Sequence, residues 1–226
     1  MTRRALRAIV TTRLWAERRA ILFACATAAI VGFIQPHGIA AITDPLTADV
    51  ATRSVWLAGP MFFCSAIGVA LALAQGPGRR GYLDSGERSA PLFGRELARA
   101  KAIAPSIAAT LTALVYWFAQ YLSGFAAPPT FFVLALACVY ATTLVALNAT
   151  VYRGGKRALA LGLCAGTVAA AYALSVYADP LQTQRGDAIG VATELAFCAI
   201  VGFLGLRQYG EGLAHFDPID PSTGSG

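Results

Sequence analysis

The chain has 226 residues, of which 57% are hydrophobic and only 13% are charged, and its formal net charge at pH 7 is +6. A soluble domain carries about twice that share of charged residues, so the composition argues against a soluble globular protein. The positive charge lies in short segments between apolar stretches instead of covering one surface. That placement argues against a nucleic-acid-binding domain.

Apolar stretches of roughly 18 residues or more recur along the chain, which is the length that a helix needs to cross a membrane. We therefore expect an all-α polytopic membrane protein with six transmembrane helices, at about residues 20–42, 54–75, 102–122, 130–151, 158–178 and 188–206. Gly59-Pro60 predicts a bend near the outer end of the second span. Pro105 lies about one turn inside the third span and predicts a kink there.

The basic residues lie on one side of this topology. Of the 18 Lys and Arg residues, all but Arg53 and Arg185 precede the first span or follow the second, fourth or sixth. The opposite loops contain four aspartates: Asp44, Asp49, Asp179 and Asp187. Because positive charge is retained on the cytoplasmic side, this asymmetry predicts that both termini are cytoplasmic. An even number of spans agrees with that orientation.

The two ends of the chain have different character. Residues 3–19 predict an amphipathic helix lying on the membrane surface, with Leu6, Ile9 and Leu14 on one side and arginines on the other. An ordinary basic flank that sets the orientation is the alternative interpretation. Residues 211–226 have little to bury, so a disordered cytoplasmic tail is expected after a membrane domain over 20–210.

A short basic segment separates the second and third spans. It lies in GERSAPLFGRELARAKAIAP, residues 86–105, where Pro91 suits the first turn of a helix. Phe93, Leu97 and Ala100 then follow at helical spacing and form an apolar face. The charged side chains point elsewhere: Arg95, Glu96, Arg99 and Lys101. The pattern predicts a short amphipathic helix that leads into the third span.

Motifs for covalent chemistry are absent from the sequence. It contains no GxxxxGK[ST] phosphate loop, no GxSxG and no HExxH. The two histidines, His37 and His215, fall on opposite sides of the expected membrane, which argues against a histidine metal centre. The five cysteines all lie in expected spans without metal-ligand spacing, so they are interpreted as packing residues. We expect that the chain is not an enzyme.

Glu194 is the only acidic residue well inside an expected span, about 7–8 Å deep on the outer side. A carboxylate there is costly unless it is paired, protonated or exposed to water. One interpretation is a residue of a transport pathway, and the other is a structural hydrogen bond or an interfacial position. Gln120 and Asn148 are expected to anchor helices to one another or to the interface. Three aromatic residues are typical of an interfacial belt: Tyr116, Trp117 and Tyr121.

The order of these parts resembles the type-2 ABC exporter permeases, the membrane half of transporters driven by a separate ATPase. The local match runs from Pro91 to Lys101, PLFGRELARAK. It is similar to that family's segment between spans two and three, a proline followed by an R-E-L…K helix. The resemblance implies that this segment is a coupling helix docked in the ATPase, and that residues 3–19 are a connector helix. The implied coupling residues are Pro91, Phe93, Arg95, Glu96, Leu97, Arg99 and Lys101.

The resemblance also implies a function. The chain would be the permease subunit of an ATP-driven exporter in a prokaryotic-type inner (plasma) membrane, paired with a second permease copy or homologue. ATP and magnesium would be bound by the ATPase subunit, so this chain would need no cofactor of its own. Family members commonly have a re-entrant helical pair between spans five and six. Residues 179–190 are too few for such a pair, which argues against an exporter of large polymers.

Two other classes of function fit the sequence. A membrane anchor or assembly subunit of a larger complex would have no ATPase partner and no nucleotide-dependent motion. A secondary transporter or channel would need buried ionisable groups to couple ion movement, and Glu194 is the one candidate for that role.

Overall fold

The computed structural model describes residues 3–40, 58–74, 94–124, 129–152, 154–178 and 188–214. This part of the chain is helical apart from short turns and contains no strand, which confirms the predicted all-α fold. Its elements are α1 (Arg3–Ala40), the π-helix η1 (Gly59–Phe63), α3 (Cys64–Ala74), α5 (Gly94–Leu122), α6 (Pro129–Ala146), α7 (Asn148–Val151), α8 (Gly155–Ala178) and α9 (Ala188–Ala214).

Five helical segments are long and apolar enough to cross a membrane: α1, α5, α6 with α7, α8 and α9. The expected second span is represented by Gly59–Ala74, a shorter apolar helix formed by η1 and α3. At 1.5 Å per residue it is about 24 Å long, somewhat less than the roughly 30 Å of a bilayer's hydrocarbon core. Residues 54–57 and 75 of that expected span lie outside the described part. The described part of the chain thus has five to six helices that are long and apolar enough to cross a membrane, as expected of a helical membrane protein.

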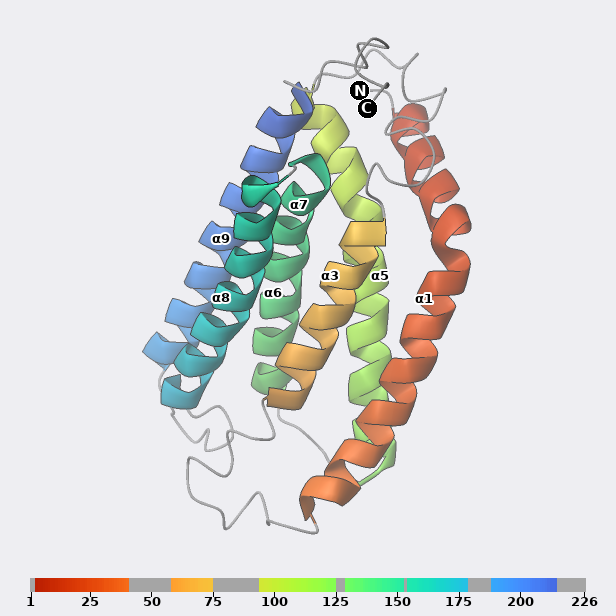
Figure 1. Ribbon diagram of the computed structural model, residues 1–226. Helices are drawn as coiled ribbons and strands as arrows, with labels where there is room; N and C mark the ends of the chain where they lie inside the picture. Colours follow the sequence, from red (N-terminus) through yellow and green to blue (C-terminus); the bar gives the residue numbers. More distant parts are fainter. Residues whose placement is uncertain are drawn as a thin grey trace.

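Successive helices run in opposite directions through one bundle (Figure 1). The starts of α1, α5 and α8 and the end of α9 lie together at the top of the view. We call this the basic end, because Arg7, Arg99, Arg157 and Arg207 lie in these parts of the helices. The end of α1 and the starts of η1, α6 and α9 lie at the opposite end. In the middle, α6 contacts α3, α5, α8 and α9, which explains why it is apolar all round.

The first helix differs from the expectation. Residues 3–19 are helical, but they do not form a separate helix, because α1 continues without a break from Arg3 to Ala40. Its 38 residues span roughly 57 Å. No proline or glycine occurs near the junction at residue 19, so nothing in the backbone ends the helix there. At the other terminus α9 includes residues 211–214, which the sequence placed in the tail; the rest of that tail lies outside the described residues.

Both expected proline distortions fall inside helices. The Gly59-Pro60 pair lies in η1, where the helix widens to a π-helical turn before it continues as α3. Pro105 lies inside α5, where its ring clashes with the preceding turn and its nitrogen has no hydrogen to donate. Figure 1 shows α5 changing direction along its length.

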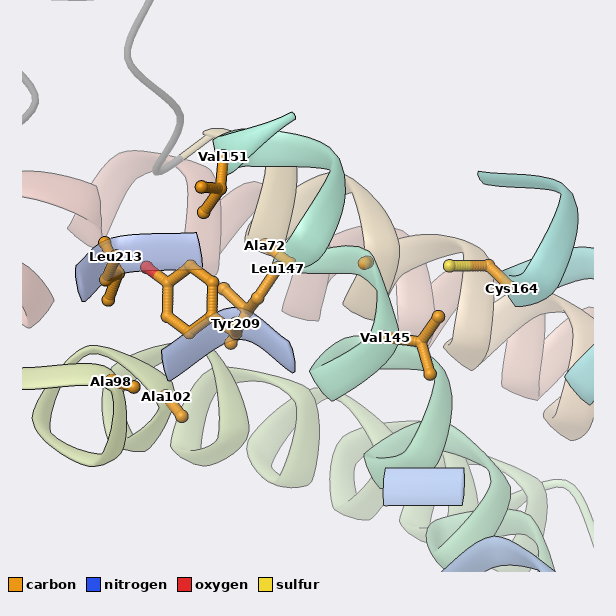
Figure 2. Close-up of a cluster of buried hydrophobic side chains, with 10 residues drawn as sticks. Ala72, Ala98, Ala102, Val145, Leu147, Val151, Cys164, Tyr209 and Leu213 are labelled. Carbon is orange, nitrogen blue, oxygen red and sulfur yellow. The ribbon is translucent and has the colours of Figure 1, made fainter. Parts of the chain in front are cut away.

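Small side chains dominate the contacts between helices. At the basic end, one buried cluster joins α3, α5, α6, α7, α8 and α9, and Figure 2 shows the Tyr209 ring of α9 beside Leu213 and near Ala98 and Ala102 of α5. Alanine and glycine allow helices to approach closely where lipid supplies no hydrophobic driving force for their association. The five cysteines are free, and four of them are buried, which agrees with a packing role.

Candidate functional site

Glu194 lies two turns into α9 and is fully buried, with 0% of its surface exposed. The hydroxyl of Ser175 on α8 donates a hydrogen bond to Glu194 Oε2, with an oxygen–oxygen distance of 2.6 Å. The Met61 sulfur of η1 lies 3.6 Å from the same hydroxyl oxygen. The expected structural hydrogen bond is therefore present, and the side chain lies inside the bundle and not on its surface. We call Glu194, Ser175 and Met61 the carboxyl site.

The carboxyl site has apolar surroundings. Ala171 and Cys198, each one turn from a member of the site, belong to a buried cluster that also includes Met61. The second carboxyl oxygen, Glu194 Oε1, is buried without a hydrogen-bond partner in the described residues. A charge is costly in such surroundings. The geometry can hold α8 to α9 through one hydrogen bond and leaves one acceptor atom without a partner.

A second polar cluster lies at the same end of the bundle. Gln35 of α1 accepts hydrogen bonds at Oε1 from the Tyr116 hydroxyl and from Gln120 Nε2, the latter at 3.1 Å. Gly59 of η1 packs so closely on the Gln35 amide that any side chain at this glycine would collide with it. The expected interhelical role of Gln120 is confirmed. The cluster joins α1, α5 and η1, and we call it the glutamine site.

The aromatic belt is only partly as expected. Tyr116 is 1% exposed and turned into the glutamine site, so its assignment to the belt is wrong. The physical reason is its hydrogen bond with Gln35, which satisfies the hydroxyl inside the bundle. Tyr121, at 60% exposure, does face outward as a belt residue would.

The π-helix η1 connects the two polar sites. Gly59 contacts the glutamine site and Met61, two residues later, contacts the carboxyl site. Through Gly59 and Met61, η1 therefore packs against side chains of both α1 and α8. Single π-helical turns within helices are frequent at functional positions. This turn is the candidate functional centre of this end of the bundle.

The sequence did not identify Ser175, Met61 or Gln35 as members of a site. Ser175 and Met61 are 114 positions apart, and Tyr116 and Gln35 are 81 apart, so no local spacing links them. One signal was present for Ser175 and Gln35: a polar side chain inside an apolar run needs a partner in a bilayer. That signal indicates that a hydrogen-bond partner is required, but it does not indicate which residue is the partner.

The expected coupling residues lie at the basic end or just before it. Pro91 and Phe93 lie outside the described residues. The backbone at Arg95, Glu96 and Leu97 belongs to α5, without a described side-chain position. Two charged side chains are described: Arg99, which is exposed as expected, and Lys101, which is not.

The expected exposure of Lys101 is wrong, because only 3% of its surface is accessible. Its turn of α5 packs inside the bundle, where α5 contacts α1, α3, α6 and α9. The alanines on both sides of it are buried as well: Ala98, Ala100, Ala102 and Ala104. A docked protein could reach Arg99 here, but not Lys101.

Comparison with known proteins adds nothing to this geometry. No protein-family model, no curated protein and no solved structure matches the chain. Among the described residues, no group of three or more His, Cys, Asp or Glu side chains is placed to hold a metal ion. Any assignment of function therefore rests on the residues and their arrangement.

Proposed function

We propose that this chain is the membrane-spanning permease subunit of an ATP-driven ABC transporter, an exporter that pairs with a second permease copy or homologue. It lies in an inner (plasma) membrane of prokaryotic type with both termini in the cytoplasm. The basic end faces the cytoplasm, where a separate ATPase subunit carries ATP and magnesium and docks on residues 91–99, because Lys101 of the expected coupling segment is buried. The anchor or assembly subunit is the alternative that lacks such a partner.

The observation that supports the proposal is the single helix α5. It begins at Gly94 within the basic segment and continues to Leu122, 29 residues or roughly 44 Å. This length exceeds the roughly 30 Å of the hydrocarbon core, so its first residues can project from the membrane as a rigid lever. Because α5 contacts α1, α3, α6 and α9, a push on the lever is passed to most of the bundle.

The proposal predicts that reversing the charge at Arg95 or at Arg99 weakens the binding of the ATPase by roughly tenfold, because each removes a charged contact and adds a repulsive one. The partner is first identified as a stoichiometric subunit that carries GxxxxGK[ST] and co-purifies with the permease. It is then titrated onto Arg95→Glu and Arg99→Glu in detergent or nanodiscs, and the dissociation constants are compared.

The matched control is Arg157→Glu, an exposed arginine at the start of α8 on the same end of the bundle. It changes the net charge equally and is expected to leave ATPase binding within about twofold. If all three variants weaken ATPase binding equally, the effect arises from net charge and not from a specific contact with α5. Unchanged binding in both α5 variants, or the absence of any ATPase partner, would reject the coupling role and favour the anchor.

A proton-coupled carrier is the second candidate, and the observation in its favour is the unpartnered Oε1 of Glu194 inside the bundle. Under the leading proposal, liposomes that contain the purified chain show no ATP-independent proton flux. The Glu194→Gln variant is then expected to show the same absence of proton flux as the wild type. The readout is a pH-sensitive dye trapped in the lumen. A proton flux that needs no ATP and disappears in Glu194→Gln would establish the carrier instead.

A further inference from the structure

A hollow at the basic end lies between α5 and α9, whose ends are close together in Figure 1. Its volume is about 360 Å³, which is within the usual range for ligand pockets of roughly 300–1,000 Å³. The described residues that line it are two arginines and two apolar residues: Arg99, Arg207, Phe203 and Leu206. This combination has a cationic part and an apolar part.

The apolar part continues along α9 into the membrane-facing surface. Ile200, Phe203 and Arg207 follow at intervals of three and four residues and so share one side of the helix. Phe203 is 66% exposed and Ile200 is exposed as well, although neither has a polar group to present to water. Such a face is suited to lipid chains, and Arg207 lies at its end, where the hydrocarbon gives way to headgroups.

Helix α5 has a similar face, with an arginine at the basic end and apolar residues further into the bundle. Arg99, Ile103 and Ile107 are spaced by four residues, with Arg99 exposed at the basic end and Ile107 partly exposed further in. Both arginines therefore terminate apolar faces on neighbouring helices. A molecule that fits this arrangement has an anionic head and long apolar chains.

The charges of the hollow favour an anion. Glu211 accepts a hydrogen bond from Nε of Arg207 at 2.9 Å, which neutralises part of its charge. The bond uses only one of the five N–H donors of the guanidinium group, so its other nitrogens can still bind an anion. Among the described side chains, two guanidinium groups against one carboxylate give this part of the hollow a net positive charge.

We propose that this hollow binds the headgroup phosphate of an anionic phospholipid, with Arg99 and Arg207 contacting the phosphate and an acyl chain lying along Phe203. Basic pockets between membrane helices on the cytoplasmic side bind such headgroups in other proteins. Arg99 also belongs to the proposed ATPase contact. The lipid site itself needs no ATPase partner, so variants at Arg207 and Arg95, which each belong to only one of the two, test the proposals separately.

The test is native mass spectrometry of the purified chain with added phosphatidylglycerol or phosphatidylcholine. The wild type binds the anionic lipid more tightly than the zwitterionic one. The double variant Arg99→Gln with Arg207→Gln loses roughly tenfold in affinity for phosphatidylglycerol and little for phosphatidylcholine. Both arginines are exposed, so circular dichroism is expected to show an unchanged fold.

The matched control is Arg7→Gln with Arg157→Gln, two exposed arginines elsewhere at the basic end. It removes the same charge and leaves binding of phosphatidylglycerol within about twofold. The proposal is overturned if the control loses as much affinity, or if the wild type binds both lipids equally. It is also overturned if soluble glycerol phosphate displaces the lipid at equal concentration, because the hollow then binds free phosphate without using its apolar part.

Two single variants separate this site from the ATPase contact. Arg207→Gln lowers lipid affinity without affecting the ATPase, and Arg95→Glu lowers ATPase binding without affecting the lipid. If both single variants change both affinities together, the lipid site as a separate entity is rejected.

Discussion

Replacing Gly205 by leucine is expected to lower the free energy of unfolding by about 3 kcal/mol. At this glycine α9 lies against the backbone of α6, so that a Cβ would meet the nitrogen of Val145 at 3.0 Å and its Cα at 3.1 Å. Backbone atoms cannot move aside as a flexible side chain can. The two helices must therefore separate to admit a larger residue.

Separation of α6 and α9 also breaks a buried hydrogen bond. Asn148 Nδ2 donates to the carbonyl oxygen of Gly205 at 2.9 Å, which confirms the interhelical role expected for Asn148. Such bonds contribute roughly 1 kcal/mol in membrane proteins. The loss adds to the cost of the steric overlap.

The measurement is unfolding by sodium dodecyl sulfate in mixed micelles, followed by far-ultraviolet circular dichroism. Gly166→Leu on α8 is the matched control, because that glycine is exposed and has open space around the position of a Cβ. We expect the control to remain within about 0.5 kcal/mol of the wild type. Similar losses in the two variants would mean that α9 does not approach α6 as closely as described.

Replacing Ser175 by alanine is expected to lower the free energy of unfolding by about 2 kcal/mol. The hydroxyl of Ser175 is the hydrogen-bond donor to Glu194 in the carboxyl site. Without it both carboxyl oxygens are buried without a partner, since Oε1 has none already. The loss of stability arises mainly because the buried carboxyl group then has no hydrogen-bond partner, and less from the lost bond itself.

A double-variant cycle isolates this cause. In a Glu194→Leu background no carboxyl group remains to be stranded, so Ser175→Ala is expected to cost less than about 0.5 kcal/mol. The same detergent unfolding measurement gives all four stabilities. An equal cost in both backgrounds would show that Ser175 contributes through packing alone, and the carboxyl site would lose its central contact.

The positions of the helices follow closely from the sequence. The expected span 130–151 agrees with the apolar segment Pro129–Val151, and the expected span 188–206 begins where Ala188–Leu213 begins but ends seven residues earlier. The physical reason is local: a run of apolar residues in a bilayer must satisfy its own backbone hydrogen bonds, and a helix does so within the run. The Gly59-Pro60 pair and Pro105 likewise predict distorted helices, because a proline ring clashes with the preceding turn and its nitrogen has no hydrogen to donate.

The buried partners did not follow from the sequence. Helical spacing placed Lys101 away from the apolar face, and its aromatic neighbours placed Tyr116 in an interfacial belt. Both are buried because of the helices that lie beside α5. Ser175 was unremarked within an apolar run until α9 placed Glu194 against it. Burial and pairing depend on neighbours that are distant in the chain, and periodicity within one helix has no information about them.

The sequence by itself determined that this is a helical membrane protein, because composition and the length of apolar runs decide how a chain can satisfy its backbone in lipid. Only the tertiary structure decided that η1 contacts both the carboxyl site and the glutamine site, and that Arg99 and Arg207 line one hollow. The reason is that these groups come together by packing between helices, where the fit of small residues fixes which faces meet.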